Sequence, residues 1–329
     1  MITLGVIGCG NMARNHMGNA VVMDGLRLHA YADVFPEAAS GFLNEFGGAY
    51  ATAEANKILA DDAIDAVLIS THHDTHVTLG VAAAEAGKHI LMEKPMSMTV
   101  SQCDALVEAV EQAGVRLMTG FKLRFAPLIQ ETKCLVPAPF LLVGQMMCNR
   151  WPDTSWAADP VKGGGNILSQ GCHTFDLICY LAGAEPVEVF AVGGNYTHEN
   201  KTYPDNLVGI IRFASGAAAS IIQGDAADTQ AVSKFFFEVF DNGTSVQLYD
   251  RLHRATVSGA NVTDPGERHA PADADPEGLQ QELAEFVACL NSGEPWRIGA
   301  DQYAGRRATA LAHAFFTSIE TGQPQEVSL

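Results

Sequence analysis

The sequence predicts an α/β protein of two domains, the first built on a doubly wound parallel sheet and the second an α+β domain on a large, mostly antiparallel open sheet. The chain has 329 residues, and a domain usually holds about 100 to 200. Short apolar runs alternate with segments of helical spacing in the first third, which is typical of parallel strands with crossover helices. Strand-like runs joined by short turns dominate the rest. We therefore expect domains at 1–122 and 123–329.

In the first domain, runs rich in β-branched residues and leucine predict strands that are buried on both faces. These strands are Ile2 to Ile7, Leu26 to Ala32, Ala66 to Ser70, His89 to Met92 and Val115 to Thr119. The segments between them carry apolar residues at helical spacing. They predict helices over Asn11 to Met23, Pro36 to Phe46, Asp74 to Ala86 and Thr99 to Ala113.

In the second domain, the glycine-rich stretch Lys162 to Gly165 precedes a predicted helix from about Asn166 to Leu181. Alternating runs and hairpin-like turns at 214–216 and 241–243 then indicate antiparallel strands. The predicted strands are Val187 to Gly194, Leu207 to Phe213, Ala217 to Gly224, Lys234 to Phe240 and Ser245 to Tyr249. Asn261 to Asp275 lacks periodicity and predicts a loop, followed by helices near Pro276 to Leu290 and Ala300 to Ser318.

Composition and charge exclude several classes of protein. Hydrophobic residues make up 47% of the chain and charged residues 18%, which is ordinary globular usage and excludes wholesale disorder. The formal net charge of −18 repels nucleic acid and anionic lipid surfaces. The seven cysteines are odd in number and form no CxxC pair, which indicates a reducing compartment. No signal-like start and no apolar run of about 18 residues is evident, so we expect a cytoplasmic protein without membrane partners.

A dinucleotide-binding motif follows the first predicted strand. Gly8-Cys9-Gly10-Asn11-Met12-Ala13 fits G-x-G-x-x-G/A between a strand and a helix, the context expected in a Rossmann domain. The first glycine allows a tight turn, the second admits a pyrophosphate, and the small third residue lets the helix pack closely. A plain glycine turn is the alternative, but an acid at the right distance argues against it.

That acid is Asp33, which lies at the end of the second predicted strand, 20 residues beyond Ala13. A carboxylate there accepts hydrogen bonds from the adenosine ribose hydroxyls. It also repels the 2′-phosphate of NADP, and no Lys or Arg occurs between Asp33 and Gly48 to offset this repulsion. NAD is therefore favoured over NADP, although FAD uses the same fingerprint.

Four further segments follow in a recognisable order. They are Thr71-His72-His73-Asp74-Thr75-His76, Glu93-Lys94-Pro95, Gly120-Phe121-Lys122-Leu123-Arg124-Phe125-Ala126-Pro127, and Gly163 to Asp176. With the glycine motif, this set resembles the Gfo/Idh/MocA family of NAD(P)-dependent sugar and inositol oxidoreductases. The last two segments look like the family's GFNxRFxP and GGGxLxDxGxHxxD patterns.

The resemblance implies roles for particular residues. Lys94 matches the lysine that contacts the reacting hydroxyl or carbonyl, and His173 matches the acid/base histidine. An imidazole suits proton transfer because its ordinary pKa is about 6.5. The cofactor contacts implied are Gly8, Gly10, Asn11, Met12, Asp33, Ser70, Thr71, His72, His76, Glu93 and Lys94. The substrate contacts implied are Lys94, Lys122, Arg150, Trp151, Ser169, His173 and Asp176.

Two departures from the family pattern leave alternatives open. Ser169 stands where inositol-dehydrogenase-like members carry an aspartate, four residues before His173. The change is compatible with an enzyme that mainly reduces a carbonyl, with one that acts on another substrate position, or with one in which Asp176 supplies the missing carboxylate. The last alternative follows from helical spacing, because Ser169, His173 and Asp176 would share one face of a continuous helix. Lys122 replaces the usual Asn, and its ammonium either meets an acidic substrate or pairs with a local carboxylate.

Other polar and aromatic residues have less specific roles. His72, His73 and His76 have a spacing compatible with a metal site, but no further ligand cluster accompanies them. We therefore expect cofactor contact or helix capping, and no metal. Arg150, Trp151 and Trp156 either line a sugar pocket or pack in the core.

These residues predict an NAD(H)-dependent oxidoreductase that acts on a secondary alcohol or ketone of a sugar, cyclitol or related polyol. The alternatives are an NAD-dependent glycoside-cleaving or eliminating enzyme that oxidises its substrate transiently, and a non-catalytic sugar or dinucleotide sensor. The resemblance further implies a homodimer or homotetramer assembled through the second domain.

Overall fold

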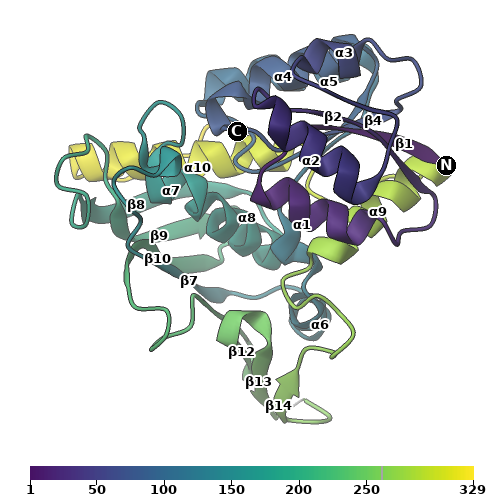
Figure 1. Ribbon diagram of the computed structural model, residues 1–329. Coiled ribbons are helices and arrows are strands. Elements are labelled where there is room, and N and C mark those ends of the chain that lie inside the picture. The colour runs from purple at the N-terminus through teal and green to yellow at the C-terminus, as the bar shows by residue number, and fades with distance from the viewer. Residues whose placement is uncertain (261) are drawn as a thin grey trace. The chain divides into compact units, whose positions relative to one another are not determined.

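The computed structural model describes residues 1–260 and 262–329 (Figure 1). The chain forms two compact units. The first consists of Met1–Phe121 and Leu279–Arg306, and the second of Lys122–Gly278 and Arg307–Leu329. Residues 279–306 thus belong to the first unit, although the sequence led us to expect them in the second domain.

The first unit contains a six-stranded parallel sheet with the strand order β3-β2-β1-β4-β5-β6. The strands are β1 (Ile2–Ile7), β2 (Leu26–Ala32), β3 (Tyr50–Thr52), β4 (Ala66–Ile69), β5 (His89–Met92) and β6 (Leu117–Thr119). Every residue of β1 is buried, because helices cover both faces. The chain runs from β1 out to β3 and resumes at β4 on the other side of β1. The predicted doubly wound sheet is confirmed.

The helices of this unit alternate with its strands, except the last one, which comes from residues 279–306. They are α1 (Asn11–Ala20), α2 (Pro36–Phe46), α3 (Ala55–Leu59), η1 (His73–Thr75), α4 (His76–Glu85), α5 (Val100–Ala113) and α9 (Leu279–Ser292). The helix α5 shows how local sequence sets the bounds: the Thr99 hydroxyl accepts a hydrogen bond from the Gln102 N–H at 3.3 Å, and Gly114 ends the helix.

The second unit contains a nine-stranded sheet with the order β14-β13-β12-β11-β7-β10-β9-β8-β15. Among its described strand pairs, β7 with β10 is parallel and the others are antiparallel, so the predicted antiparallel sheet is confirmed. The strands are β7 (Leu141–Asn149), β8 (Pro186–Gly194), β9 (Asn206–Phe213), β10 (Ala218–Ala227), β11 (Phe235–Asp241), β12 (Thr244–Tyr249), β13 (Arg254–Gly259), β14 (Gly266–His269) and β15 (Gln325–Glu326).

Helices cover one face of this sheet. They include α6 (Pro127–Leu135), α7 (Gly165–Ser169), α8 (Gly171–Ala182) and the part of α10 (Gln302–Thr321) from Arg307 onward, with short turns η2 (Lys122–Phe125), η3 (Trp156–Ala158) and η4 (Asp250–Leu252). The buried rings of Phe175 on α8 and Phe315 on α10 lie 5.1 Å apart. The side chains of β8, β9 and β10 alternate between this core and the opposite face.

Several elements differ from the prediction. The strand β7 was missed because its apolar residues fall on both faces and hide the alternation of its burial. The predicted loop 261–275 contains β14, and its first residue, Asn261, lies outside the described residues. In the described part of the chain, no helix is both long and apolar enough to cross a membrane.

His198 joins its own loop to the loop of Asp153 and to the strand β10 through two carboxylates. Its Nδ1 lies 2.7 Å from an oxygen of Asp153, and its Nε2 lies 2.7 Å from an oxygen of Asp225. Burial alone would lower the pKa of His198, but the hydrogen bonds to Asp225 and Asp153 outweigh it and raise the pKa. The folded unit therefore holds a proton on His198 that the unfolded chain releases above about pH 6.5.

We predict that the free energy of unfolding falls as the pH rises above about 6.5 and passes through the raised pKa of His198, because that proton is then lost from the folded state as well. Urea unfolding at a series of pH values measures this slope. His198→Gln should flatten it, whereas His269→Gln, at a largely exposed position, should not. Equal slopes for wild type and His198→Gln would contradict the assignment.

Candidate active site

The turn after β1 leaves room beside the start of α1. Gly8 has φ +93°, and a Cβ there would lie 2.4 Å from the carbonyl oxygen of Ser70, so only glycine fits. A Cβ built on Gly10 would meet no atom within 4 Å. The next small position, Ala13, is fully buried. The open space at Gly10 and the backbone N–H groups at the start of α1 suit a pyrophosphate.

Asp33 lies directly after β2 and is held against this turn. One carboxylate oxygen accepts a hydrogen bond from the Cys9 N–H at 2.7 Å, and the other accepts one from the Phe35 N–H at 2.9 Å. Burial, with a smaller effect of Asp33, raises the pKa of the Cys9 thiol to about 12. Cys9 is therefore a packing residue and not a nucleophile.

The loop after β4 carries the next group of predicted residues. Ser70 and Thr71 are partly buried and His72 is exposed, whereas His76 at the start of α4 is fully buried. The Nδ1 of His76 lies 2.8 Å from the carbonyl oxygen of Pro95, and its Nε2 lies 3.3 Å from that of Thr71. Burial lowers the pKa of His76 despite these two carbonyls. A neutral ring carries one N–H, so the shorter contact is the hydrogen bond.

Lys94 follows β5 in a segment that is fixed on both sides. The Lys94–Pro95 peptide bond is cis. Glu93 is buried, and one of its carboxylate oxygens lies 2.8 Å from Nε2 of the fully buried His16. The other oxygen accepts a hydrogen bond from the Lys94 backbone N–H at 3.2 Å. The polypeptide around Lys94 is thus held by polar contacts within the unit.

All these predicted cofactor residues lie at one edge of the sheet, apart from His76, which is buried at the start of α4. The strands β1, β2, β4 and β5 are parallel, so the residues after each of them meet at the carboxyl edge. The strand order reverses between β1 and β4, which is where dinucleotides bind in doubly wound sheets.

In the second unit, two glycines at the start of α7 make close contacts. At Gly165, φ is +76° and a Cβ would lie 2.2 Å from the ring of Tyr203. At Gly163, a Cβ would lie 2.3 Å from the Cα of Ala157. The Tyr203 hydroxyl donates a hydrogen bond to the Ala158 carbonyl at 2.6 Å, and burial raises its pKa to about 12, so it remains protonated.

The helix predicted over 166–181 is two helices. The helix α7 ends at Ser169 and α8 begins at Gly171, with Gln170 at φ −107° between them. Ser169 therefore lies on a different helix from His173 and Asp176, so the three residues do not share one face of a continuous helix as predicted. The side chains of Ser169, His173 and Asp176 are all buried.

Asp176 forms a buried ion pair with Arg124. Its two carboxylate oxygens accept hydrogen bonds from Nε of Arg124 at 2.8 Å and from Nη2 at 2.6 Å. The Arg124 side chain is 8% exposed and the Asp176 side chain 1%. A two-pronged pair of this kind fixes orientation as well as distance, so it holds α8 to the η2 turn.

The remaining predicted substrate residues have local partners. Lys122 pairs with Glu277 at 2.8 Å, and Glu277 also pairs with Arg251. Burial would raise the pKa of Glu277, but these two cations lower it. Arg150 pairs with Asp153 at the surface. The backbone N–H of Trp151 lies 3.3 Å from an oxygen of Asp225.

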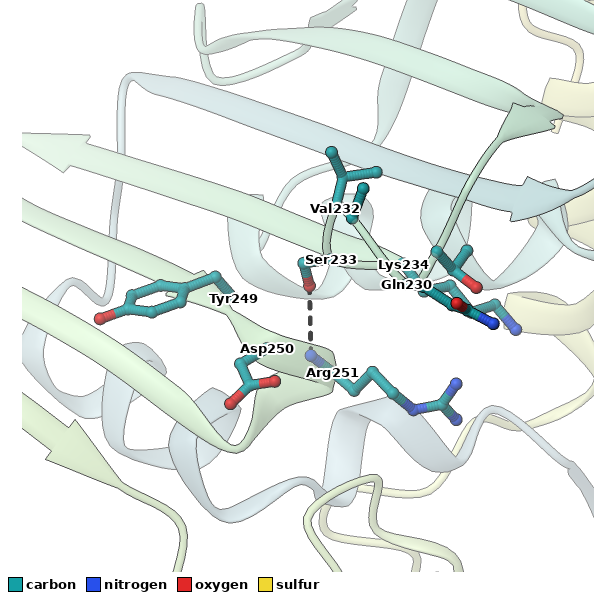
Figure 2. Close-up of a pocket in the computed structure, with 9 residues that line it drawn as sticks. Gln230, Val232, Ser233, Lys234, Tyr249, Asp250 and Arg251 are labelled. Carbon is teal, nitrogen blue, oxygen red and sulfur yellow. Dashed lines mark hydrogen bonds between the residues drawn. The ribbon is translucent and has the colours of Figure 1, made fainter.

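A polar surface pocket of about 330 Å³ lies elsewhere in the second unit, lined by residues 229–234 and 249–251 (Figure 2). The Arg251 backbone N–H donates a hydrogen bond to the Ser233 hydroxyl at 3.2 Å. None of the predicted site residues lines this pocket. Within the described residues, no group of three or more His, Cys, Asp or Glu side chains is arranged to hold a metal.

The sequence interpretation missed His16. It lies in the stripe Ala13, His16, Met17 and Ala20, which faces the core of the unit at helical spacing. A histidine in such a stripe signals a buried polar contact, but the sequence does not identify Glu93 as the partner.

The comparisons with known proteins agree with this geometry. The model of an oxidoreductase family with an NAD-binding Rossmann fold matches residues 2–121. The model of the Gfo/Idh/MocA C-terminal domain matches residues 139–245. The chain belongs to the Gfo/Idh/MocA family. The resemblance stated from the sequence is confirmed, and the protein is an NAD-dependent oxidoreductase.

Relatives of known activity match along nearly the whole chain. The protein is 29% identical to myo-inositol 2-dehydrogenase of Thermotoga maritima, with 96% of each chain covered. It is 27% identical to 1,5-anhydro-D-fructose reductase of Ensifer adhaerens, with 98% of each chain covered. Among solved structures, levoglucosan dehydrogenase in complex with NADH and levoglucosan has a TM-score of 0.91 at 22% identity, with 100% of both chains covered.

We predict that Arg124→Met destabilises the second unit by about 3 to 5 kcal/mol, because it leaves the Asp176 carboxylate buried without its cation. Urea unfolding measures the change. The double variant Arg124→Met/Asp176→Leu should be more stable than Arg124→Met, since it removes the buried charge as well. A loss below about 1 kcal/mol in Arg124→Met would mean that the pair contributes no more than a surface salt bridge.

Proposed function

We propose that the protein transfers a hydride between NAD and a secondary alcohol or ketone of a sugar, cyclitol or related polyol. The observation that carries the proposal is the carboxyl edge of the parallel sheet, where the glycine turn, Asp33 and Lys94 lie together. The myo-inositol dehydrogenase and anhydrofructose reductase relatives act on ring-shaped polyols or their ketones, as their names state. That is the substrate class expected here.

The chain fits NAD on its own residues. The space beyond Gly10 admits a pyrophosphate, and the Asp33 carboxylate lies beside it. The negative charge of Asp33 favours ribose hydroxyls over a 2′-phosphate, so NADP is disfavoured. Bound NAD supplies the hydride acceptor, and NADH the donor, for the reaction. Asn11, Met12, Ser70, Thr71 and His72 are proposed to complete the cofactor contacts.

Lys94 and His173 are proposed to handle the proton. The Lys94 ammonium donates a hydrogen bond to the substrate oxygen and stabilises negative charge as it develops there. The His173 imidazole takes the hydroxyl proton during oxidation and returns it during reduction. Pre-positioned groups of this kind typically contribute factors of about 10² to 10⁴ to the rate.

Because Ser169 stands in place of an aspartate, the roles of Ser169 and Asp176 beside His173 have to be assigned. Of the alternatives for this departure, the one in which Asp176 supplies a carboxylate to His173 is the least favoured, because both its oxygens bond Arg124. We propose that Asp176 positions α8 and that Ser169 contacts substrate as a neutral group.

Lys122, Arg150 and Trp151 are proposed as substrate contacts at the margin of the site. Lys122 has a carboxylate partner in Glu277, which agrees with local pairing as the first role of its ammonium. Arg150 is half exposed and available to hydroxyl groups of a polyol.

We also propose a homo-oligomer in the cytoplasm. The face of the nine-stranded sheet opposite α8 exposes apolar side chains in register: Val192 pairs with Val208, and Val208 pairs with Ile222. The first two are 64% and 58% exposed. An apolar sheet face of this kind marks a protein interface, and a second copy of the chain is the proposed partner. Light scattering on the purified protein tests for a dimer or tetramer.

Two other functions are tested by the same assay. An enzyme that oxidises transiently to cleave or eliminate a glycoside would release product with catalytic NAD and no accumulation of NADH. A sensor would bind sugar or dinucleotide without turnover. Lys94 and His173 are both present, which argues against the sensor.

We predict steady formation of NADH from NAD with at least one compound in a panel of sugars and cyclitols that includes myo-inositol, or NADH consumption with the corresponding ketoses. Absorbance at the NADH band measures turnover, and NADP should support it poorly because of Asp33. Glycoside cleavage without NADH accumulation would select the transient mechanism instead, and binding without any chemistry would select the sensor.

A further inference from the structure

Two buried histidines hold the residues on either side of Lys94. The Nε2 of His16 on α1 lies 2.8 Å from a carboxylate oxygen of Glu93. The Nδ1 of His76 on α4 lies 2.8 Å from the carbonyl oxygen of Pro95. Both imidazoles are fully buried. The segment 93–95 is therefore attached to two different helices, one on each side of the lysine.

Core packing alone does not account for these histidines. His16 shares a buried stripe with Met17 and Ala20, where an apolar side chain would pack without a polar group to satisfy. Burying an imidazole is unfavourable unless its nitrogen is hydrogen-bonded. Each ring instead directs a nitrogen at the neighbour of Lys94, and the two rings use different nitrogens, Nε2 in His16 and Nδ1 in His76.

The helices that carry the histidines begin at the loops assigned above to the cofactor. The helix α1 starts directly after Gly10, and α4 follows the loop with Thr71 and His72. The same two elements therefore carry the proposed cofactor contacts and the proposed attachments of Lys94. A shift of either helix would be transmitted to the lysine through one hydrogen bond.

We propose that His16 and His76 are positioning residues that hold the Lys94 ammonium in place for the reaction. This inference rests on the proposed role of Lys94. His16 acts through the Glu93 side chain and His76 through the Pro95 carbonyl, and neither contacts the substrate. Displacement of a reacting group by about 1 Å can cost a factor of about 10² in rate, which sets the size of the expected effect.

The two nitrogens allow matched variants. The amide nitrogen of Gln occupies roughly the place of Nε2, and that of Asn the place of Nδ1. His16→Gln and His76→Asn should therefore keep the donor, whereas His16→Leu and His76→Leu remove it. Where a leucine variant does not fold, the crossed variants His16→Asn and His76→Gln remove the bond with a polar residue of similar size.

The first measurement is steady-state kinetics with NAD and the fastest compound of the panel. We expect kcat to fall about 10- to 100-fold in the leucine or crossed variants, with KM for NAD within about threefold of wild type. His16→Gln and His76→Asn should recover kcat to within about threefold. Folded leucine and crossed variants with wild-type kcat, or matched variants no better than the leucine ones, would overturn the inference.

Lys94→Ala in the same assay separates the two claims. Loss of turnover in Lys94→Ala with normal kcat in the histidine variants would remove only the positioning role. Full turnover in Lys94→Ala would instead overturn the proposed role of Lys94 and, with it, the inference.

Hydrogen exchange of the NADH complex tests the attachment without any substrate. We expect faster exchange of residues 93–97 in the leucine or crossed variants and wild-type exchange in the matched ones. The turn at Lys88 provides the internal comparison, because the Lys88 Nζ donates to the carbonyls of Asp61 and Ile64 at 2.8 and 2.9 Å. Unchanged exchange at 93–97, or equal acceleration at Lys88, would contradict a specific attachment.

Discussion

The parallel register of β1, β2, β4 and β5 is the constraint on which the first unit depends. Parallel strands end at the same edge, so the residues after each strand are brought together although they are far apart in sequence. Because the strand order reverses between β1 and β4, the crossover connections lead away from this point in opposite directions and leave the edge open. This strand arrangement alone brings the glycine turn, Asp33 and Lys94 to one surface of the unit.

Buried polar pairs then fix the positions of residues that the topology only brings close together. In the first unit, His16 and Glu93 form such a pair. In the second, Arg124 and Asp176 do so around the helix that carries His173. A buried pair adds little net stability relative to apolar side chains, but losing one member is costly because the other stays buried. Each pair is accordingly better suited to fixing orientation than to stabilising the fold.

The sequence predicted features that depend on local pattern and missed those that depend on distant partners. Gly8 and Asp33 were identified because a strand, a tight turn and an acid follow one another within a short span. The break at Gln170 was missed, although Gly171 was a weak signal of it, because helical apolar spacing continues across the junction. The partner of His16 lies 77 residues away, and the partner of Lys122, Glu277, lies 155 residues away. Hydrophobic periodicity carries no information about contacts between residues so far apart in sequence.

The central claim is that Lys94 and His173 act in the same hydride-transfer step. A double-mutant cycle on the pre-steady-state rate of NADH formation, with Lys94→Met, His173→Gln and the double variant, tests it most directly. Residues that act as a unit are strongly non-additive, so each single variant should be slower by about 10²-fold or more and the double variant about as slow as the slower single one. A double-variant loss equal to the product of the single losses, or a single variant that keeps the wild-type rate, would contradict the account.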